Sequence, residues 1–122
     1  MALSHKQAAQ VIARSEIGDQ IHRETGSGDL NTTLDIQFRT RIVSVQLHLD
    51  ASTSTAQTFE LSVVSDGGSE YDTLLVSCPM SGVHDVFIPT GFVIGEDDQL
   101  NLSFPNTDGS TYGLTVLYTS HI

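Results

Sequence analysis

The sequence predicts an all-β protein, an antiparallel β-sandwich of about seven or eight short strands. Apolar and polar residues alternate in successive stretches, which is the period of a strand with one buried face. Turn signals rich in Gly, Pro, Asn and Asp recur about every 8–15 residues, and no helical pattern lies between them to serve as a parallel crossover. A jelly-roll-like topology is favoured over an immunoglobulin one, because the chain lacks the Cys…Trp…Cys core.

Residues 95–119 carry the clearest pattern, which predicts a β-hairpin. Two alternating strands are separated by a polar stretch in which Pro105 has no amide hydrogen to donate and Gly109 tolerates a positive φ. The apolar positions of the two predicted strands are Leu100, Leu102 and Phe104, followed by Tyr112, Leu114, Val116 and Tyr118.

Residues 1–30 are predicted to form an N-terminal arm in front of a β domain that spans residues 31–122. Ser4 and Gln7 match a capping box, and the apolar spacing that follows predicts a short helix over about residues 5–16. A helix of ~12 residues is marginal in water, so this one needs a surface to dock on. The arm is either a surface-packed or disordered leader, or a segment that reaches a neighbouring subunit. In the second case, deletion of residues 1–30 is expected to weaken partner attachment and to leave the β domain folded.

Between the arm and the predicted hairpin, the alternation predicts five strands, near residues 33–38, 43–49, 59–63, 74–78 and 83–88. Residues 91–95 are predicted to be a short apolar connector. Leu74, Val76 and Cys78 are predicted to face inward together, and Pro89 is predicted to end the strand near residues 83–88.

Charge is distributed unevenly along the chain, whose net charge is −10. All five basic residues lie in the first 41 positions, whereas residues 42–122 hold ten acids and no Lys or Arg. An acidic β domain repels phosphate backbones, which argues against nucleic-acid binding. A solvated acidic surface, a basic partner or a metal among carboxylates could each account for the excess.

The lone Cys78 has no partner for an internal disulfide and is predicted to be a small buried apolar side chain. No apolar run approaches the ~20 residues of a membrane-spanning helix, and residues 1–16 lack the apolar core of a secretory signal. We therefore expect synthesis in a cytoplasm and no membrane partner.

Candidate metal ligands are few. The five histidines are scattered without zinc spacing, so none is assigned a metal or catalytic role. The dense acid cluster Glu96-Asp97-Asp98 is the one candidate for calcium; the alternative is a charged loop that discourages edge pairing. The histidines are His5, His22, His48, His84 and His121.

Enzymatic chemistry has little support in the sequence. No Gly-x-Ser-x-Gly elbow is present, and the absence of tryptophan removes the usual platform for sugar stacking. Tyr112 and Tyr118 share a strand face with apolar residues, so they are expected in the core or in an interface. The chain is therefore predicted to be non-enzymatic and to need no cofactor.

The chain resembles small virion structural proteins of tailed bacteriophages over about residues 42–119. In size, acidity and arm-plus-sandwich layout it is most similar to head decoration (cement) proteins. The residues that carry the resemblance are Gly95-Glu96, Asn106 and the run Tyr112-Gly113-Leu114-Thr115-Val116-Leu117-Tyr118.

This resemblance implies a homo-oligomer, often a homotrimer, that binds the major capsid protein lattice on the exterior of the virion and stabilises it. It also implies that the N-terminal arm lies over neighbouring subunits, where its arginines meet carboxylates. The expected partner contacts are Val11, Ile12, Arg14, Ile17, Ile21, Arg23, Arg39, Arg41, Tyr112 and Tyr118.

Two other classes share the predicted fold. A carbohydrate- or receptor-binding module of a phage tail or surface protein is the main alternative, and the missing tryptophan counts against it. A hydrolase on a jelly-roll scaffold would need acids or histidines clustered on one face.

Overall fold

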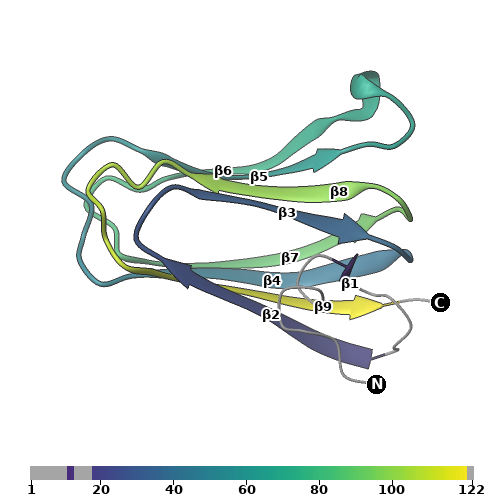
Figure 1. Ribbon diagram of the computed structural model, residues 1–122, viewed down its shortest axis with the longest axis horizontal. Coiled ribbons are helices and arrows are strands. Elements are labelled where there is room, and N and C mark those ends of the chain that lie inside the picture. Colours follow the sequence, from purple (N-terminus) through teal and green to yellow (C-terminus); the bar gives the residue numbers. More distant parts are fainter. Residues whose placement is uncertain (1–10, 13–17, 121–122) are drawn as a thin grey trace.

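The computed structural model describes residues 11–12 and 18–120, which form a two-layer β-sandwich (Figure 1). One sheet has the strand order β1-β3-β8-β5-β6 and the other the order β2-β9-β4-β7. The elements are β1 (Val11–Ile12), β2 (Gly18–Gly26), β3 (Leu30–Ile36), β4 (Thr40–Leu49), β5 (Thr58–Val64), the 3-10 turn η1 (Ser69–Tyr71), β6 (Thr73–Pro79), β7 (Asp85–Ile94), β8 (Gln99–Phe104) and β9 (Tyr112–Ser120). Among the described residues, no helix is long and apolar enough to cross a membrane.

The strands pair in a nested order. β5 pairs with β6, β4 with β7, β3 with β8 and β2 with β9, each pair antiparallel. Successive pairs alternate between the two sheets, so the chain is arranged like one long hairpin whose tip lies between β5 and β6 and which has been wrapped into a sandwich. This is the arrangement of an eight-stranded jelly roll. The prediction of an all-β antiparallel sandwich is confirmed.

The core lies between the sheets and is made by the alternate residues of each strand. Along β9 every second side chain is buried, and along β8 the buried side chains are Leu100, Leu102 and Phe104. Full burial of such a side chain contributes ~1.5–3 kcal/mol. A single apolar cluster therefore holds both sheets together.

A β-bulge in β4 changes which residues of that strand face inward. The pairing of β4 with both neighbours shifts between Ile42 and Ser44, so Ile42 and Val45 are both buried while Val43 is half-buried. Pro89, predicted to end a strand, instead pairs with Ser44 inside β7, which continues to Ile94. β7 is an edge strand, where a residue without an amide hydrogen is tolerated. The predicted connector 91–95 is therefore mostly strand.

The predicted hairpin of residues 95–119 is wrong, although both of its strands exist. β8 and β9 lie in different sheets, and residues 105–111 cross from one sheet to the other. Asn106, at φ 53°, is buried in this crossing, and its side-chain amide donates to the carbonyls of Gly28 and Ser110, each at 2.9 Å. Alternation fixes the buried face of a strand but does not select its partner.

The N-terminal division also needs correction. Gly18–Gly26, assigned to the arm, is the edge strand β2 and pairs with β9 along its whole length. Residues 27–29, within the predicted linker, form the short turn between β2 and β3. The predicted helix over residues 5–16 lies outside the described residues except for Val11–Ile12, which form the short strand β1 parallel to β3. A deletion that spares β2 must therefore stop before residue 18.

β6 is more exposed than the sequence predicts. Leu74 is exposed, while Val76 and Cys78 are half-buried opposite Leu61 and Phe59. The cause is an irregular register between β5 and β6 at the outer edge of the five-stranded sheet. Cys78 is a free thiol, as expected from its being the only cysteine.

Candidate functional site

The outer face of the four-stranded sheet has a cross-strand row in which three of the four strands contribute an apolar side chain. Ile21 on β2 pairs with Leu117 on β9, which in turn faces Ser44 on β4. Ser44 pairs with Pro89 on β7, and half-buried Val43 lies beside it in the bulge. Ile21 is 54% exposed, although it belongs to a regular strand. An outward row of this kind is unusual, because the solvent face of an antiparallel sheet is ordinarily polar.

Two arginines and two further apolar side chains flank this row. Arg23 and Phe87 lie on one side of it, in a cross-strand row that also contains Gln46. Arg41 and Val93 pair directly on the other side. Phe87 is 61% exposed and Val93 49%. The outer patch is defined here as Ile21, Arg23, Arg41, Phe87 and Val93.

The arginines of the outer patch have no carboxylate partner among residues 11–12 and 18–120. Arg41 donates from Nη1 to the carbonyl of Gly91 at 3.0 Å, and Arg23 forms no ion pair with any described residue. Because arginine holds its charge at all ordinary pH values, this face carries two cations that pair with no carboxylate of the described residues. The patch therefore combines apolar surface with donors that match carboxylates.

The expected partner contacts divide among several places. Ile21, Arg23 and Arg41 meet on the outer patch, whereas exposed Arg39 lies in the β3–β4 connection. Tyr112 and Tyr118 were expected either in the core or in an interface, and at 6% and 4% exposure both lie in the core. Val11 and Ile12 form β1 at the edge of the other sheet, and Arg14 and Ile17 lie outside the described residues.

Phe87 and Val93 were not identified from the sequence. The signal was the run Val86-Phe87-Ile88, which is apolar at three consecutive positions and therefore on both faces of its strand. The predicted strand end at Pro89 hid Val93, whose exposure follows from the continuation of β7 to Ile94.

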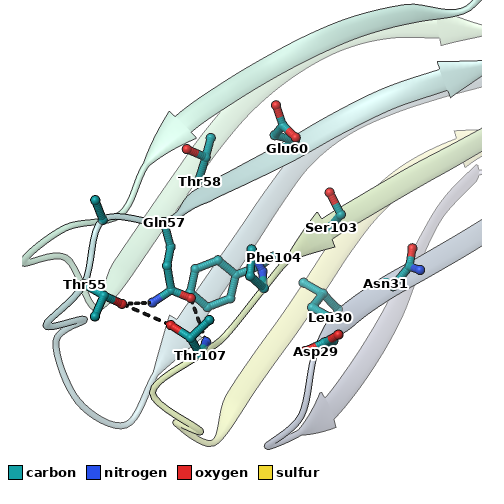
Figure 2. A pocket seen from close by; sticks show the side chains of 12 residues that line it. Asp29, Leu30, Asn31, Thr55, Gln57, Thr58, Glu60, Ser103, Phe104 and Thr107 are labelled. Atoms are coloured by element: carbon teal, nitrogen blue, oxygen red, sulfur yellow. Dashed lines mark hydrogen bonds between the residues drawn. The ribbon is translucent and has the colours of Figure 1, made fainter.

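A polar groove of about 660 Å³ opens at one end of β3, β8 and β5, the three inner strands of the five-stranded sheet (Figure 2). The Gln57 side chain crosses it, donating to Thr55 Oγ1 at 2.8 Å and accepting from the Thr107 amide at 2.8 Å. Phe104 contributes to its wall but is fully buried, so no aromatic face is available for stacking. The groove offers amide, hydroxyl and carboxylate groups to a polar ligand.

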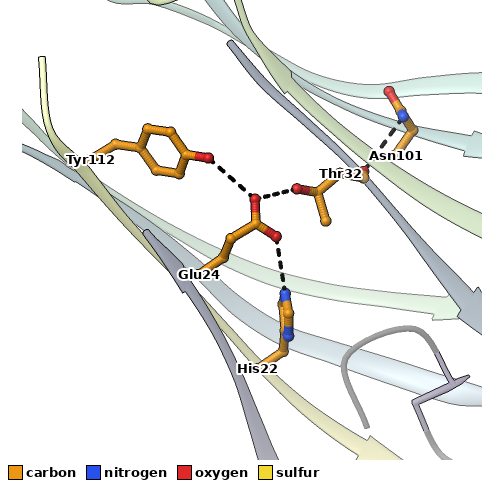
Figure 3. A network of polar contacts seen from close by, with 5 residues as sticks. All are labelled: His22, Glu24, Thr32, Asn101 and Tyr112. Atoms are coloured by element: carbon orange, nitrogen blue, oxygen red, sulfur yellow. Dashed lines mark hydrogen bonds and ion pairs between the residues drawn. The ribbon is translucent and has the colours of Figure 1, made fainter. Parts of the chain in front are cut away.

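A second polar cluster closes the edge between β2 and β3 (Figure 3). Glu24 Oε2 accepts from Thr32 Oγ1 at 2.6 Å and from the Tyr112 hydroxyl at 3.3 Å. His22 Nε2 lies 3.6 Å from Glu24 Oε1. Burial, followed by the charge of Glu24 and its hydrogen bond, raises the pKa of Tyr112 above its usual range. These contacts join the two sheets at an edge where β2 presents polar side chains inward.

The acid cluster proposed for calcium does not converge. Asp97 and Asp98 line a groove of about 390 Å³ with Asp35 and Asp66, whereas Glu96 is not part of its lining. Asp98 Oδ1 already accepts the backbone amide of Asp66 at 2.9 Å. Among the described residues, no three of these carboxylates bring ligand atoms close together. The cluster carries no metal assignment.

Two of the scattered histidines do converge, on one carboxylate. Asp85 Oδ1 lies 2.5 Å from His48 Nδ1, and Asp85 Oδ2 lies 2.8 Å from His84 Nδ1. The hydrogen bond from His48 is the main reason that the pKa of Asp85 falls below its usual range. Sequence spacing could not reveal this group, because His48 comes from a different strand.

No family model matches the chain, and no curated protein sequence matches it. Among solved structures it is similar to the nucleoplasmin-like N-terminal domain of Drosophila FKBP39, with 10% identity, a TM-score of 0.47, and coverage of 85% of this chain and 91% of that one. It is also similar to the structure of the infectious bursal disease virus Gx strain, with 11% identity, a TM-score of 0.39, and coverage of 84% of this chain and 33% of that one.

Proposed function

We propose that the protein is a non-enzymatic structural subunit that assembles through the outer patch, as a capsid decoration protein on the exterior of a virion. The partner surfaces are a neighbouring copy of this chain and the major capsid protein lattice. The observation that carries the proposal is the gathering, on one face of a sheet, of apolar side chains and two arginines that form no ion pair among residues 11–12 and 18–120.

The side-chain types of the outer patch are those that stabilise interfaces. Phe and Arg are enriched in the buried centre of protein interfaces, and they account for a large share of the binding energy. Phe87 and Arg23 occupy opposite edge strands of the same cross-strand row. A partner that covers both would span the sheet from edge to edge, ~14 Å, across Thr115 and Gln46, and it would lie beside the row that holds Ile21.

Charge selects the kind of partner. Burying the patch removes two arginines from water, which is favourable only if carboxylates meet them. The remainder of this chain supplies such a surface, since residues 42–122 hold ten acids and no Lys or Arg. The contact between copies is therefore heterologous, patch against acidic surface, and it closes into a ring such as a trimer when the rotation fits.

Light scattering on the full chain tests self-assembly. We expect a defined oligomer, and we expect Phe87→Ser and Arg23→Glu each to weaken association at least ~10-fold, as for central aromatic and arginine contacts elsewhere. Tyr71→Ser is the matched control, because Tyr71 is 62% exposed but lies on η1, away from the four-stranded sheet. A monomer at every concentration would contradict the proposal.

Cosedimentation with purified DNA-filled capsids tests the lattice partner. We expect saturable binding by the wild type, weaker binding by Phe87→Ser and unchanged binding by Tyr71→Ser. A chain lacking residues 1–17 tests the arm without removing β2. Equal binding by all variants would reject the outer patch as the attachment surface.

The polar groove favours one alternative, a carbohydrate- or receptor-binding module. Its Gln57 amide and surrounding hydroxyls suit a polar ligand, although an exposed aromatic platform is missing from its lining. Glycan binding that is lost in Gln57→Ala and retained in Phe87→Ser would support this alternative over assembly.

A further inference from the structure

We infer that His48, His84 and Asp85 form a binding site for one divalent transition-metal ion of the Zn²⁺ type. The site lies where β4 ends and β7 begins. None of the three residues belongs to the outer patch, so the inference is independent of the proposed function.

The backbone brings the three residues together. His48 and Asp85 are directly paired in the β4–β7 ladder, so their side chains share one face of the sheet. The Leu49 amide donates to the carbonyl of His84 at 2.7 Å, which holds the residue before β7 against the end of β4. Because a hydrogen-bonded sheet carries these positions, the site is set by the fold rather than by a mobile loop.

The ligand atoms are close to the separation that a metal requires. One donor atom from each residue lies within 4.8 Å of the others, and both Nδ1 atoms already contact the carboxylate. Tetrahedral Zn²⁺ with bonds of ~2.0–2.2 Å places its ligand atoms ~3.3 Å apart. All three side chains are more than half exposed, so small rotations can open the space for an ion. In the metal-bound state each imidazole is neutral, with Nδ1 bound to the ion and its single ring proton on Nε2.

The donor set selects the class of metal. Two imidazole nitrogens and one carboxylate oxygen suit Zn²⁺, Cu²⁺ or Ni²⁺, whereas Ca²⁺ and Mg²⁺ prefer oxygen ligands alone. Three protein ligands leave at least one coordination position for water or for a donor from another molecule. The site is therefore an open one.

The electrostatic surroundings favour a cation. The chain carries a net charge of −10, and no Lys or Arg follows Arg41. Arg41 is seven residues from His48 along β4, a distance of roughly 23 Å, and Arg23 lies on β2, three strands away from Asp85.

Isothermal titration of the full chain with zinc chloride at neutral pH tests the site. We expect one saturable ion per chain, and we expect His48→Gln and Asp85→Asn each to weaken binding at least ~10-fold. Asp29→Asn is the matched control for Asp85→Asn, because it removes the same chemical group at a described position outside the cluster, and it should bind like the wild type. Circular dichroism in the absence of metal should give closely similar melting temperatures for all four proteins.

Nitrogen-15 spectra of the imidazoles identify the bound atoms. On addition of Zn²⁺, the Nδ1 resonances of His48 and His84 should shift to the values of metal-bound nitrogens. The Nε2 resonances should have the values of protonated imidazole nitrogens. Absence of saturable binding, unchanged affinity in Asp85→Asn, or coordination through other histidines would each overturn the inference.

Discussion

The two outer faces of the sandwich differ in chemistry although both belong to similar antiparallel sheets. The four-stranded sheet presents Ile21, Phe87 and Val93 together with Arg23 and Arg41, which form no ion pair within the part of the chain that the structure describes. The five-stranded sheet presents a polar ladder, in which Asn101 Nδ2 lies 3.1 Å from Thr33 Oγ1 and Gln99 Nε2 lies 2.8 Å from Asp35 Oδ1. The five-stranded sheet also exposes Val64 and Leu74 on its β5–β6 side, so the contrast is between the outer patch and the polar ladder of β3 and β8.

This difference separates two uses of a sheet surface. Cross-strand pairs such as those of Asn101 stabilise the sheet that carries them. Exposed apolar side chains give the folded chain little stability, but they become favourable when a partner covers them. We therefore expect the ladder to matter for folding and the outer patch for assembly.

The largest expected losses of stability test whether both sheets are held together by one common core. Phe104 in the five-stranded sheet and Leu114 in the four-stranded sheet are both buried in the shared core. Phe104→Ala should cost ~3–5 kcal/mol and Leu114→Ala ~2–5 kcal/mol of unfolding free energy, measured by urea denaturation. A loss below ~1 kcal/mol for either one would mean that its sheet is not held by the common core.

A pair of outer-face substitutions tests the comparison directly. Asn101→Ala should lower the free energy of unfolding by ~1 kcal/mol, because its amide bonds across to β3. Phe87→Ala should change it by less than ~0.5 kcal/mol, because its ring is 61% exposed. Urea denaturation under conditions where the protein is monomeric measures both changes in the free energy of unfolding. Equal losses would remove the distinction between the faces.

The edge where the sheets meet gives a pH-dependent effect. Because the folded chain raises the pKa of Tyr112 by burial and by the charge of Glu24, the folded state holds this proton more tightly. Its contribution to stability is present below the ordinary tyrosine pKa of ~10 and is lost as pH rises through the folded value. Tyr112→Phe should cost only ~0.5 kcal/mol at neutral pH and should become less destabilising relative to wild type above pH ~10. A constant difference across this range would contradict the raised pKa.

The smallest effect lies at Asp85, which is exposed. Its lowered pKa, caused first by the hydrogen bond with His48, gives a contribution that is present above the ordinary aspartate pKa and is lost as pH falls through the folded value. Carboxyl-carbon NMR should find Asp85 titrating below its usual range, and His48→Gln should move the pKa upward. An unchanged titration in that variant would show that His48 is not the main cause.

Much of the secondary structure could be predicted from sequence because alternation reports burial within one strand. The pattern placed Leu100, Leu102 and Phe104 on one face of a strand, and all three are buried. The partners of that strand could not be predicted, because the same face can pack in either sheet. β2 was missed because its inward positions are Gln20, His22 and Glu24, which the edge of the sandwich accepts as hydrogen-bonded groups.

The candidate sites were harder to predict than the strands. Ile21, Arg23 and Arg41 were chosen as partner contacts, but their common face with Phe87 depends on the register of four strands. The convergence of His48 on Asp85 likewise depends on the β4–β7 ladder.

The sequence by itself determined the class of the fold, the acidic character of the chain and most of the buried positions, since these follow from composition and from a period of two residues. Only the tertiary structure decided the nested strand order, the membership of Gly18–Gly26 in the sheet and the groups that meet on its surface. The physical reason is that pairing between strands is a long-range choice, made by the burial of both inner faces at once.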